Sequence, residues 1–145
     1  MRLTAGQRAA VAVRIEFARA ELADAQEYAS LDWATYQTDA KARRNVERIA
    51  ENVANAAVDI AKILLAGRGM AAVPETYREV LTALAPAGLA ESGDVPDLVR
   101  LAQLRNTLSH RYLDHKWALI KWFIDNGRSA VGAWLDRCER VIAPE

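Results

Sequence analysis

The segment RNTLSHRY, from Arg105 to Tyr112, gathers side chains that suit chemistry on a phosphodiester. An arginine fork can hold two phosphate oxygens and stabilise the charge that grows in the transition state. A histidine, with an unperturbed pKa of about 6.5, can accept or donate a proton near neutral pH. In RNA the neighbouring 2′-hydroxyl supplies the nucleophile, so the protein need not provide one. Arg105 and His110 are therefore candidate catalytic residues for RNA cleavage.

Helical geometry predicts how this segment displays its side chains. If its leucines form a buried face, a turn of about 100° per residue places Arg105 and Tyr112 on one flank of that face. Asn106 and His110, four residues apart, then emerge together roughly 140° further round. We expect one helix to present a cation, an amide, an imidazole and a phenol on its non-core side.

The same residues also have ordinary structural interpretations. Arg105 can pair with a carboxylate, His110 can cap the helix, and Tyr112 can pack at the helix end. A single motif histidine is also short of a separate acid and base. We therefore expect a homodimer, in which two copies converge on one scissile phosphate.

Length and composition predict one all-α domain over residues 1–145. The chain is 52% hydrophobic, and it has only four prolines and seven glycines, too few for many short strands. Lys+Arg and Asp+Glu both number 19, so the formal net charge is zero. A generally cationic nucleic-acid binder is excluded, and any RNA contact requires a local basic patch. Zero net charge also removes a barrier to self-association.

Cysteine usage and hydropathy indicate the compartment. Cys138 is the only cysteine, so there is no intrachain disulfide, and we expect a packed thiol, no metal and no cofactor. Arg14, Glu16 and Arg19 interrupt any signal-peptide stretch near the N-terminus. No apolar run approaches the roughly 20 residues of a membrane helix. We therefore expect a cytoplasmic protein without a membrane segment.

Apolar periodicity and capping residues predict an antiparallel bundle of about five helices. The expected helices run from a Thr4–Gln7 capping box to about Ala29, from Thr38 to Ala66, from Pro74 to Ala85, from an N-cap at Asp94 with Pro96 in the first turn, and from about Asp114 or His115 to Val141.

Several loop and core positions are also predicted. Ser30 to Trp33 is expected to be a turn, and Gly67 a left-handed C-terminal cap. Asn126-Gly127 is expected to be a weak point within one continuous last helix. The tryptophans are expected mainly in the core or in a dimer contact, namely Trp33, Trp117, Trp122 and Trp134.

RNTLSHRY resembles the R-x4-H-x-Y signature of HepT toxins, within the wider HEPN superfamily. Three longer stretches resemble that family in the right order, namely ERIAENVANAAVDIAKILLAG, PETYREVLTALAPAG and LAQLRNTLSHRYLDHKW. The resemblance covers most of the chain. It implies a HEPN-like helical bundle that acts as a metal-independent ribonuclease toxin, usually as a homodimer with the two motifs facing across a cleft.

The resemblance also implies roles for individual residues. Arg105 and His110 match the catalytic pair, and Asn106 matches the polar residue that commonly follows the arginine. Tyr112 matches the tyrosine that the partner antitoxin, a minimal nucleotidyltransferase, modifies with AMP. Such a modification would add bulk and negative charge beside Arg105. Arg111 is a departure, because relatives often carry a small residue there.

Other charged residues have two interpretations each. Asp59 lies in an apolar stretch, where it either orients Arg105 or His110 at the cleft edge or occupies an ordinary flank. A basic cluster around the motif is either a phosphate-attracting patch or a solvated helix face, and consists of Arg100, Arg105, Arg111, Lys116 and Lys121. A second basic run is interpreted as a solvated face, and consists of Lys41, Arg43, Arg44 and Arg48.

An alternative function belongs to a different class. Related helical proteins serve as non-catalytic partners or substrate-binding subunits of nucleotidyltransferases, without the Arg–His pair. The presence of Arg105, His110 and Tyr112 together favours the ribonuclease, because a scaffold needs none of them.

Overall fold

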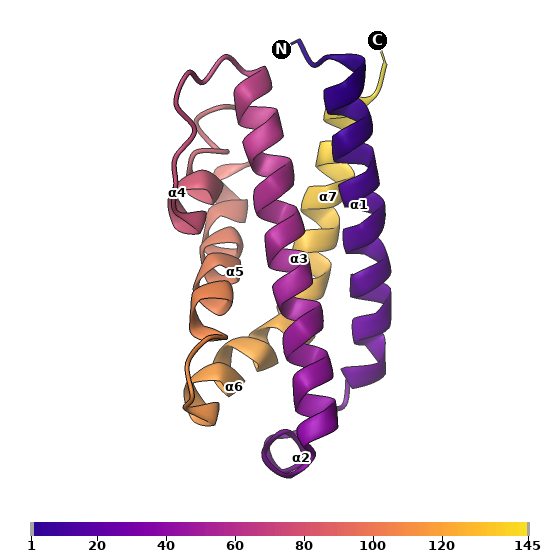
Figure 1. Cartoon of the computed structure of the whole chain (residues 1–145), viewed down its shortest axis with the longest axis vertical. Coiled ribbons are helices and arrows are strands. Elements are labelled where there is room, and N and C mark those ends of the chain that lie inside the picture. Colours follow the sequence, from indigo (N-terminus) through magenta and orange to yellow (C-terminus); the bar gives the residue numbers. More distant parts are fainter. Residues whose placement is uncertain (1, 145) are drawn as a thin grey trace.

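Four long helices dominate the computed structural model, which describes residues 2–144 (Figure 1). They are α1 (Ala5–Ala25), α3 (Ala40–Gly67), α5 (Val95–Thr107) and α7 (Arg128–Ile142), and successive long helices run in opposite directions. No strand occurs between residues 2 and 144. The predicted all-α antiparallel bundle is therefore confirmed, with both chain ends at the same end of the bundle.

Shorter elements connect the long helices. Gln26–Tyr28 forms a 3-10 turn after α1, and Ser92–Asp94 forms another before α5. The short α-helices are α2 (Trp33–Thr38), α4 (Tyr77–Thr82) and α6 (Leu113–Trp122). Helices α2 and α6 contact each other at the end of the bundle opposite the termini. This end holds the connection between α5 and α6 (Figure 1).

Local capping explains where α1 and α3 begin. The predicted capping box is present, because Thr4 Oγ1 accepts the Gln7 N–H at 3.0 Å and Gln7 Oε1 accepts the Thr4 N–H at 2.9 Å. Asp39 caps α3 by accepting the Ala42 N–H at 3.0 Å. The predicted bounds of α3 are therefore correct to within two residues.

One loop prediction is correct except at its last residue, and another is wrong. Residues 30–32 form the expected turn, but Trp33 is already helical, because α2 begins there and Asp32 accepts the Thr35 N–H at 2.8 Å. That hydrogen bond also lowers the pKa of Asp32. The left-handed residue after α3 is Gly69, with φ +87°, whereas Gly67 is still helical.

The starts of α4 and α5 also differ from the prediction. Pro74 does not open α4, because Thr76 caps that helix by accepting the Glu79 N–H at 3.2 Å. Asp94 directly precedes α5, but its carboxylate accepts the Glu91 N–H instead of capping the helix. Pro96 lies in the first turn of α5 as expected.

The predicted last helix is continuous but changes direction. Helix α6 leads into a π-helical turn, Phe123–Gly127, and then into α7, which lies at an angle to α6 (Figure 1). Gly127 is buried, and a Cβ there would lie 3.1 Å from Trp122 Cη2. The expected weak point at Asn126-Gly127 is therefore the place where the helix bends.

The core is built from the apolar stripes of the long helices. Trp134 is buried in α7, and its Nε1 donates to the Leu89 carbonyl oxygen at 3.2 Å, so the indole is buried without losing a hydrogen bond. Cys138 is buried beside it, and desolvation raises the pKa of its thiol to about 12. Within the described range, no helix combines the length and the apolarity that crossing a membrane requires.

Candidate functional site

The motif is divided between a helix and a turn. Arg105 and Asn106 lie in the last turn of α5, which ends at Thr107, and His110 follows in the connection to α6. The Ser109 hydroxyl donates to the Asn106 carbonyl oxygen at 3.1 Å, and the His110 N–H donates to the Thr107 carbonyl oxygen at 2.9 Å. These bonds use carbonyls that a longer helix would need. The prediction of a single helix face carrying the whole motif is therefore wrong.

Arg105 is held by residues from two other helices. Its Nε donates to Asn55 Oδ1 of α3 at 3.0 Å. The Tyr77 hydroxyl of α4 donates to the same oxygen at 3.3 Å, and Arg105 Cζ lies 5.3 Å from the centre of the Tyr77 ring. All three residues are partly buried. The guanidinium is thus fixed along one edge and one face.

The other residues of the motif to which a function was assigned face solvent. Asn106, His110 and Arg111 are exposed, and Tyr112 is 69% exposed, with its ring 5.7 Å from the ring of His115. Neither Arg105 nor His110 lies in the bundle interior, so both can meet a large substrate. In the described part of the chain, no hydrogen bond joins Arg105 to His110.

In this structure Asp59 contacts Arg14 of α1. Its Oδ2 lies 3.8 Å from Arg14 Nε, across the surface between α3 and α1. The residue of α3 that accepts the Arg105 Nε–H bond is instead Asn55, one helical turn before Asp59. Asn55 was missed, although it is a polar residue within a stretch of α3 whose neighbours Val53, Ala54 and Ala56 are buried.

The basic cluster around the motif is smaller than expected. Lys116 Nζ lies 3.3 Å from Glu47 Oε1, and Lys121 Nζ lies 2.8 Å from Asp125 Oδ2. Among the described residues, Arg105 has a neutral amide as its hydrogen-bonding partner, so its charge is not compensated by a direct ion pair. Within the described residues of this cluster, the cations without an ion pair are therefore Arg105 and the exposed Arg100 and Arg111.

Comparison with known proteins now identifies the family. The family described as ribonuclease HepT-like matches residues 18–131, a range that includes Asn55, Tyr77 and the whole RNTLSHRY segment. The chain belongs to this family. A crystal structure of a toxin-antitoxin with AMP-PNP has a similar fold, with a TM-score of 0.79 at 16% sequence identity. The alignment covers 90% of this chain and 98% of that chain. A search of curated proteins gave no match.

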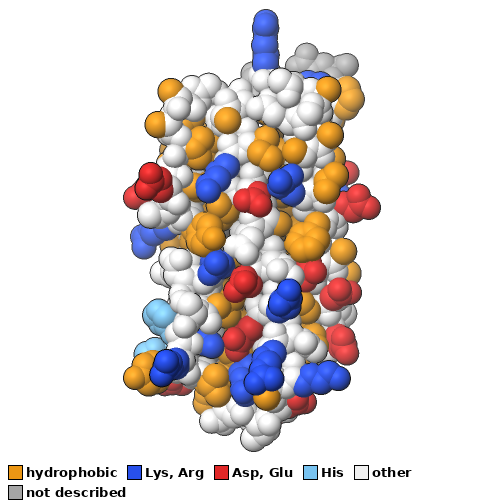
Figure 2. All heavy atoms as spheres, viewed as in Figure 1, with side chains coloured by type: hydrophobic (Ala, Val, Ile, Leu, Met, Phe, Trp, Pro, Cys, Tyr) orange, Lys and Arg blue, Asp and Glu red, His pale blue; other side chains and the backbone are white. Residues whose placement is uncertain are grey.

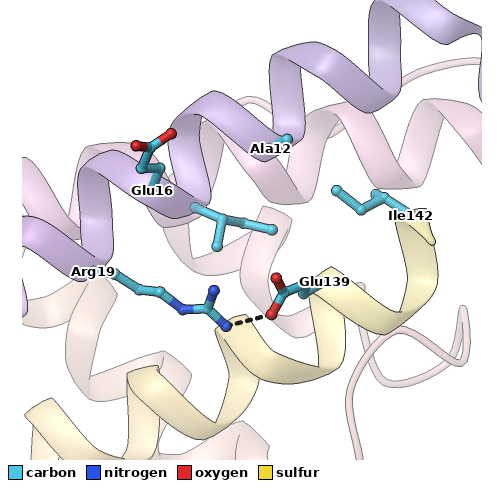
Figure 3. Close-up of a pocket in the computed structure, with 6 residues that line it drawn as sticks. Ala12, Glu16, Arg19, Glu139 and Ile142 are labelled. Atoms are coloured by element: carbon cyan, nitrogen blue, oxygen red, sulfur yellow. Dashed lines mark hydrogen bonds and ion pairs between the residues drawn. The ribbon is translucent and has the colours of Figure 1, made fainter.

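A second arginine of this HepT-like chain shows what a neutralised guanidinium looks like. Arg19 Nη2 lies 2.7 Å from Asp136 Oδ1 and 2.7 Å from Glu139 Oε2. Arg19 and Glu139 line a pocket of about 350 Å³ between α1 and α7 (Figure 3). Hydrogen bonds to Glu139 and Asp136 raise the pKa of Arg19. This pocket is therefore a poor candidate for an anion site, in contrast to the surroundings of Arg105.

An aromatic and ionic cluster holds the start of α6 in the HepT-like bundle. The Tyr36 ring lies 5.0 Å from the Trp117 ring and 6.2 Å from the Trp33 ring. The Tyr36 hydroxyl donates to Glu47 Oε2 at 2.7 Å, and burial together with this bond raises the pKa of Tyr36. Glu47 also contacts Lys116, four residues after Tyr112. The cluster therefore anchors the helix that follows the exposed motif turn.

Lys116→Met should destabilise the protein by about 1–3 kcal/mol, because it leaves Glu47 partly buried without its cation. The Lys116 and Glu47 side chains are only 12% and 17% exposed. Lys121→Met is the matched control, because it breaks the exposed i,i+4 pair with Asp125 and should cost about 0.5 kcal/mol or less. Urea unfolding followed by circular dichroism measures both. Equal losses for the two variants would contradict the anchoring role of Lys116.

Proposed function

We propose that this chain is a metal-independent endoribonuclease that acts in the cytoplasm as the toxin of a toxin–antitoxin pair. The observation that carries the proposal is the uncompensated guanidinium of Arg105, held at the end of α5 beside the exposed turn that contains His110. Membership of the ribonuclease HepT-like family supports the reaction class. The toxin-antitoxin with a similar fold supports the toxin role.

The proposed reaction uses the 2′-hydroxyl of the RNA as the nucleophile. Arg105 holds the non-bridging oxygens of the scissile phosphate and stabilises the charge that develops on them. His110 accepts the proton of the 2′-hydroxyl, and the 2′-oxygen forms a bond to phosphorus while the bond to the 5′-oxygen breaks. His110 of a second copy donates a proton to the leaving 5′-oxygen. The products are a 2′,3′-cyclic phosphate and a free 5′-hydroxyl.

A hollow between α1 and α3 is the face that we assign to the second copy. It has a volume of about 350 Å³, and Val13 and Phe17, which line it, are 64% and 46% exposed. Asn55 lines the same hollow and also binds Arg105, so a partner seated there would lie next to Arg105. Exposed apolar side chains of this size favour a protein contact.

Charge favours a second copy as the occupant of this hollow. Arg14 and Asp59 both line it, and a two-fold axis can place Arg14 of one copy opposite Asp59 of the other. Figure 2 views the side of the molecule where α3 lies in front, and shows basic and acidic side chains interspersed there. With 19 residues of each sign, two copies also carry no net charge that would keep them apart.

His110→Ala should abolish RNA cleavage and growth arrest, because the proton acceptor is lost, while the exposed position leaves the fold intact. His115→Ala is the matched control, since it removes the other histidine, five residues later, and should retain activity. Cleavage of labelled RNA in the presence of EDTA, with analysis of the product ends for a cyclic phosphate, measures the reaction.

Equal cleavage by His110→Ala and the parent would show that the catalytic assignment is wrong. A parent that binds a nucleotidyltransferase stably, but neither cuts RNA nor arrests growth, would instead support the alternative role as a non-catalytic partner or substrate-binding subunit.

Phe17→Asp should convert the dimer to a monomer and lower cleavage at least tenfold, because a charge is placed in the apolar contact and the composite site is lost. Ala12→Asp is the matched control, because Ala12 lies on the α7 side of the same helix. Light scattering gives the mass of each variant in solution. A Phe17→Asp protein that keeps the parental mass would exclude this face as the dimer contact.

Tyr112 is proposed as the site where a nucleotidyltransferase antitoxin attaches AMP, and its 69% exposure makes the hydroxyl accessible to such a partner. Co-expression with the nucleotidyltransferase should increase the mass of the peptide containing Tyr112 by one AMP group and suppress cleavage. Tyr112→Phe should remain unmodified, as peptide mass analysis would show. Modification of the Tyr112→Phe protein to the parental extent would place the acceptor at another residue.

A further inference from the structure

Arg105 is joined to a residue fifty positions earlier in the chain. Its Nε donates to Asn55 Oδ1 at 3.0 Å, and the Tyr77 hydroxyl donates to that same oxygen at 3.3 Å. The Tyr77 ring lies against the guanidinium, 5.3 Å from Arg105 Cζ. Helices α3, α4 and α5 each supply one of these three residues, so the direction of the guanidinium depends on how the three helices pack.

The remaining donors of Arg105 form a fork. The bond to Asn55 uses only Nε, and Nη1 and Nη2 donate to no acceptor among the described residues. Two parallel N–H groups of this kind match two oxygens of a phosphate. The orientation imposed through Nε therefore decides where the fork points.

The chemical type of residue 55 decides how much charge the fork keeps. An amide oxygen accepts the Nε–H bond but carries no net charge. A carboxylate in the same place would form the same bond and also neutralise the guanidinium. Arg19 shows this second arrangement, because it is paired with Asp136 and Glu139 at 2.7 Å each.

We propose that Asn55 is a positioning residue of the RNA site, supported by Tyr77, and that it aims the Arg105 fork at the scissile phosphate while leaving its charge free. Asn55 acts through Arg105 and does not itself touch RNA. The assignment rests on the proposed ribonuclease function and adds to it a residue outside the RNTLSHRY segment.

Asn55→Asp separates positioning from mere structural support, provided that light scattering shows the parental mass for the variant, because Asn55 also lines the hollow assigned to the second copy. The variant keeps the shape of the side chain and an acceptor for Nε, so the melting temperature should stay at the parental value or rise. It also adds a negative charge against the guanidinium, so kcat/KM for RNA should fall at least tenfold. A purely structural Asn55 would give a stable variant with parental activity.

Asn45→Asp is the matched control. Asn45 is exposed on α3, ten residues earlier, which is about 15 Å along the helix axis. The same charge is added to the same helix at more than the Debye length of about 10 Å at 0.1 M salt. This variant should keep parental kcat/KM. The kcat/KM of Tyr77→Phe should lie between the values of the parent and of Asn55→Asp, because this variant keeps the ring and loses only the hydroxyl.

Binding is measured separately from cleavage in proteins that also carry His110→Ala. A fluorescein-labelled single-stranded RNA oligonucleotide gives Kd as a function of salt concentration. The slope of log affinity against log salt should become shallower by about 0.7 for each phosphate contact that Asn55→Asp removes. In the same background, Asn45→Asp should leave the slope unchanged.

The outcomes separate this inference from the proposed function. If the parent cuts RNA, and Asn55→Asp cuts as fast and binds with the same salt slope, the positioning role is wrong and the ribonuclease stands. If the parent does not cut RNA, the ribonuclease assignment fails, and the salt slopes alone decide whether Asn55 positions a phosphate contact. If the His110→Ala parent does not bind the oligonucleotide either, both assignments fail.

Discussion

The contact between the last turn of α5 and the middle of α3 is the constraint on which the site depends. Arg105 is long and flexible, and an unattached guanidinium at a helix end would sample many directions. The bond from Nε to Asn55 at 3.0 Å and the Tyr77 ring 5.3 Å away restrict it. The cost of ordering the side chain is thereby met during folding, before any substrate arrives, which is the general basis of preorganised electrostatic stabilisation.

The motif combines a fixed part with an exposed part. Arg105 is partly buried among three helices, whereas His110 and Tyr112 lie in the turn after α5 ends at Thr107. The roles that we propose for them, proton acceptor for His110 and modification site for Tyr112, both require access by other molecules, and a turn on the surface supplies it. The Glu47–Lys116 contact and the aromatic rings around Tyr36 hold α6 immediately after this turn. The turn is therefore anchored at both ends while its side chains face solvent.

Local patterns in the sequence predict the helices well and the site only in part. The capping box at Thr4 and the apolar stripes depend on residues three or four apart, so they can be read from the sequence. The end of α5 could not be predicted from the sequence, because the leucine stripe continues to Leu108 although the helix ends at Thr107. Helix α2 was missed because six residues are too few to show a stripe, although Asp32 is a typical N-cap.

The partner of Arg105 could not be predicted for a related reason. Asn55 is fifty residues away, and no periodic pattern records which polar residue of α3 meets α5. In a chain with equal numbers of acidic and basic residues, local potential depends on which cations meet carboxylates. Lys116, Lys121 and Arg19 each form an ion pair with a carboxylate. Arg105 instead forms a hydrogen bond to an amide. A chain without net charge can therefore still present an uncompensated cation at one place, because tertiary packing, and not composition, distributes the charge.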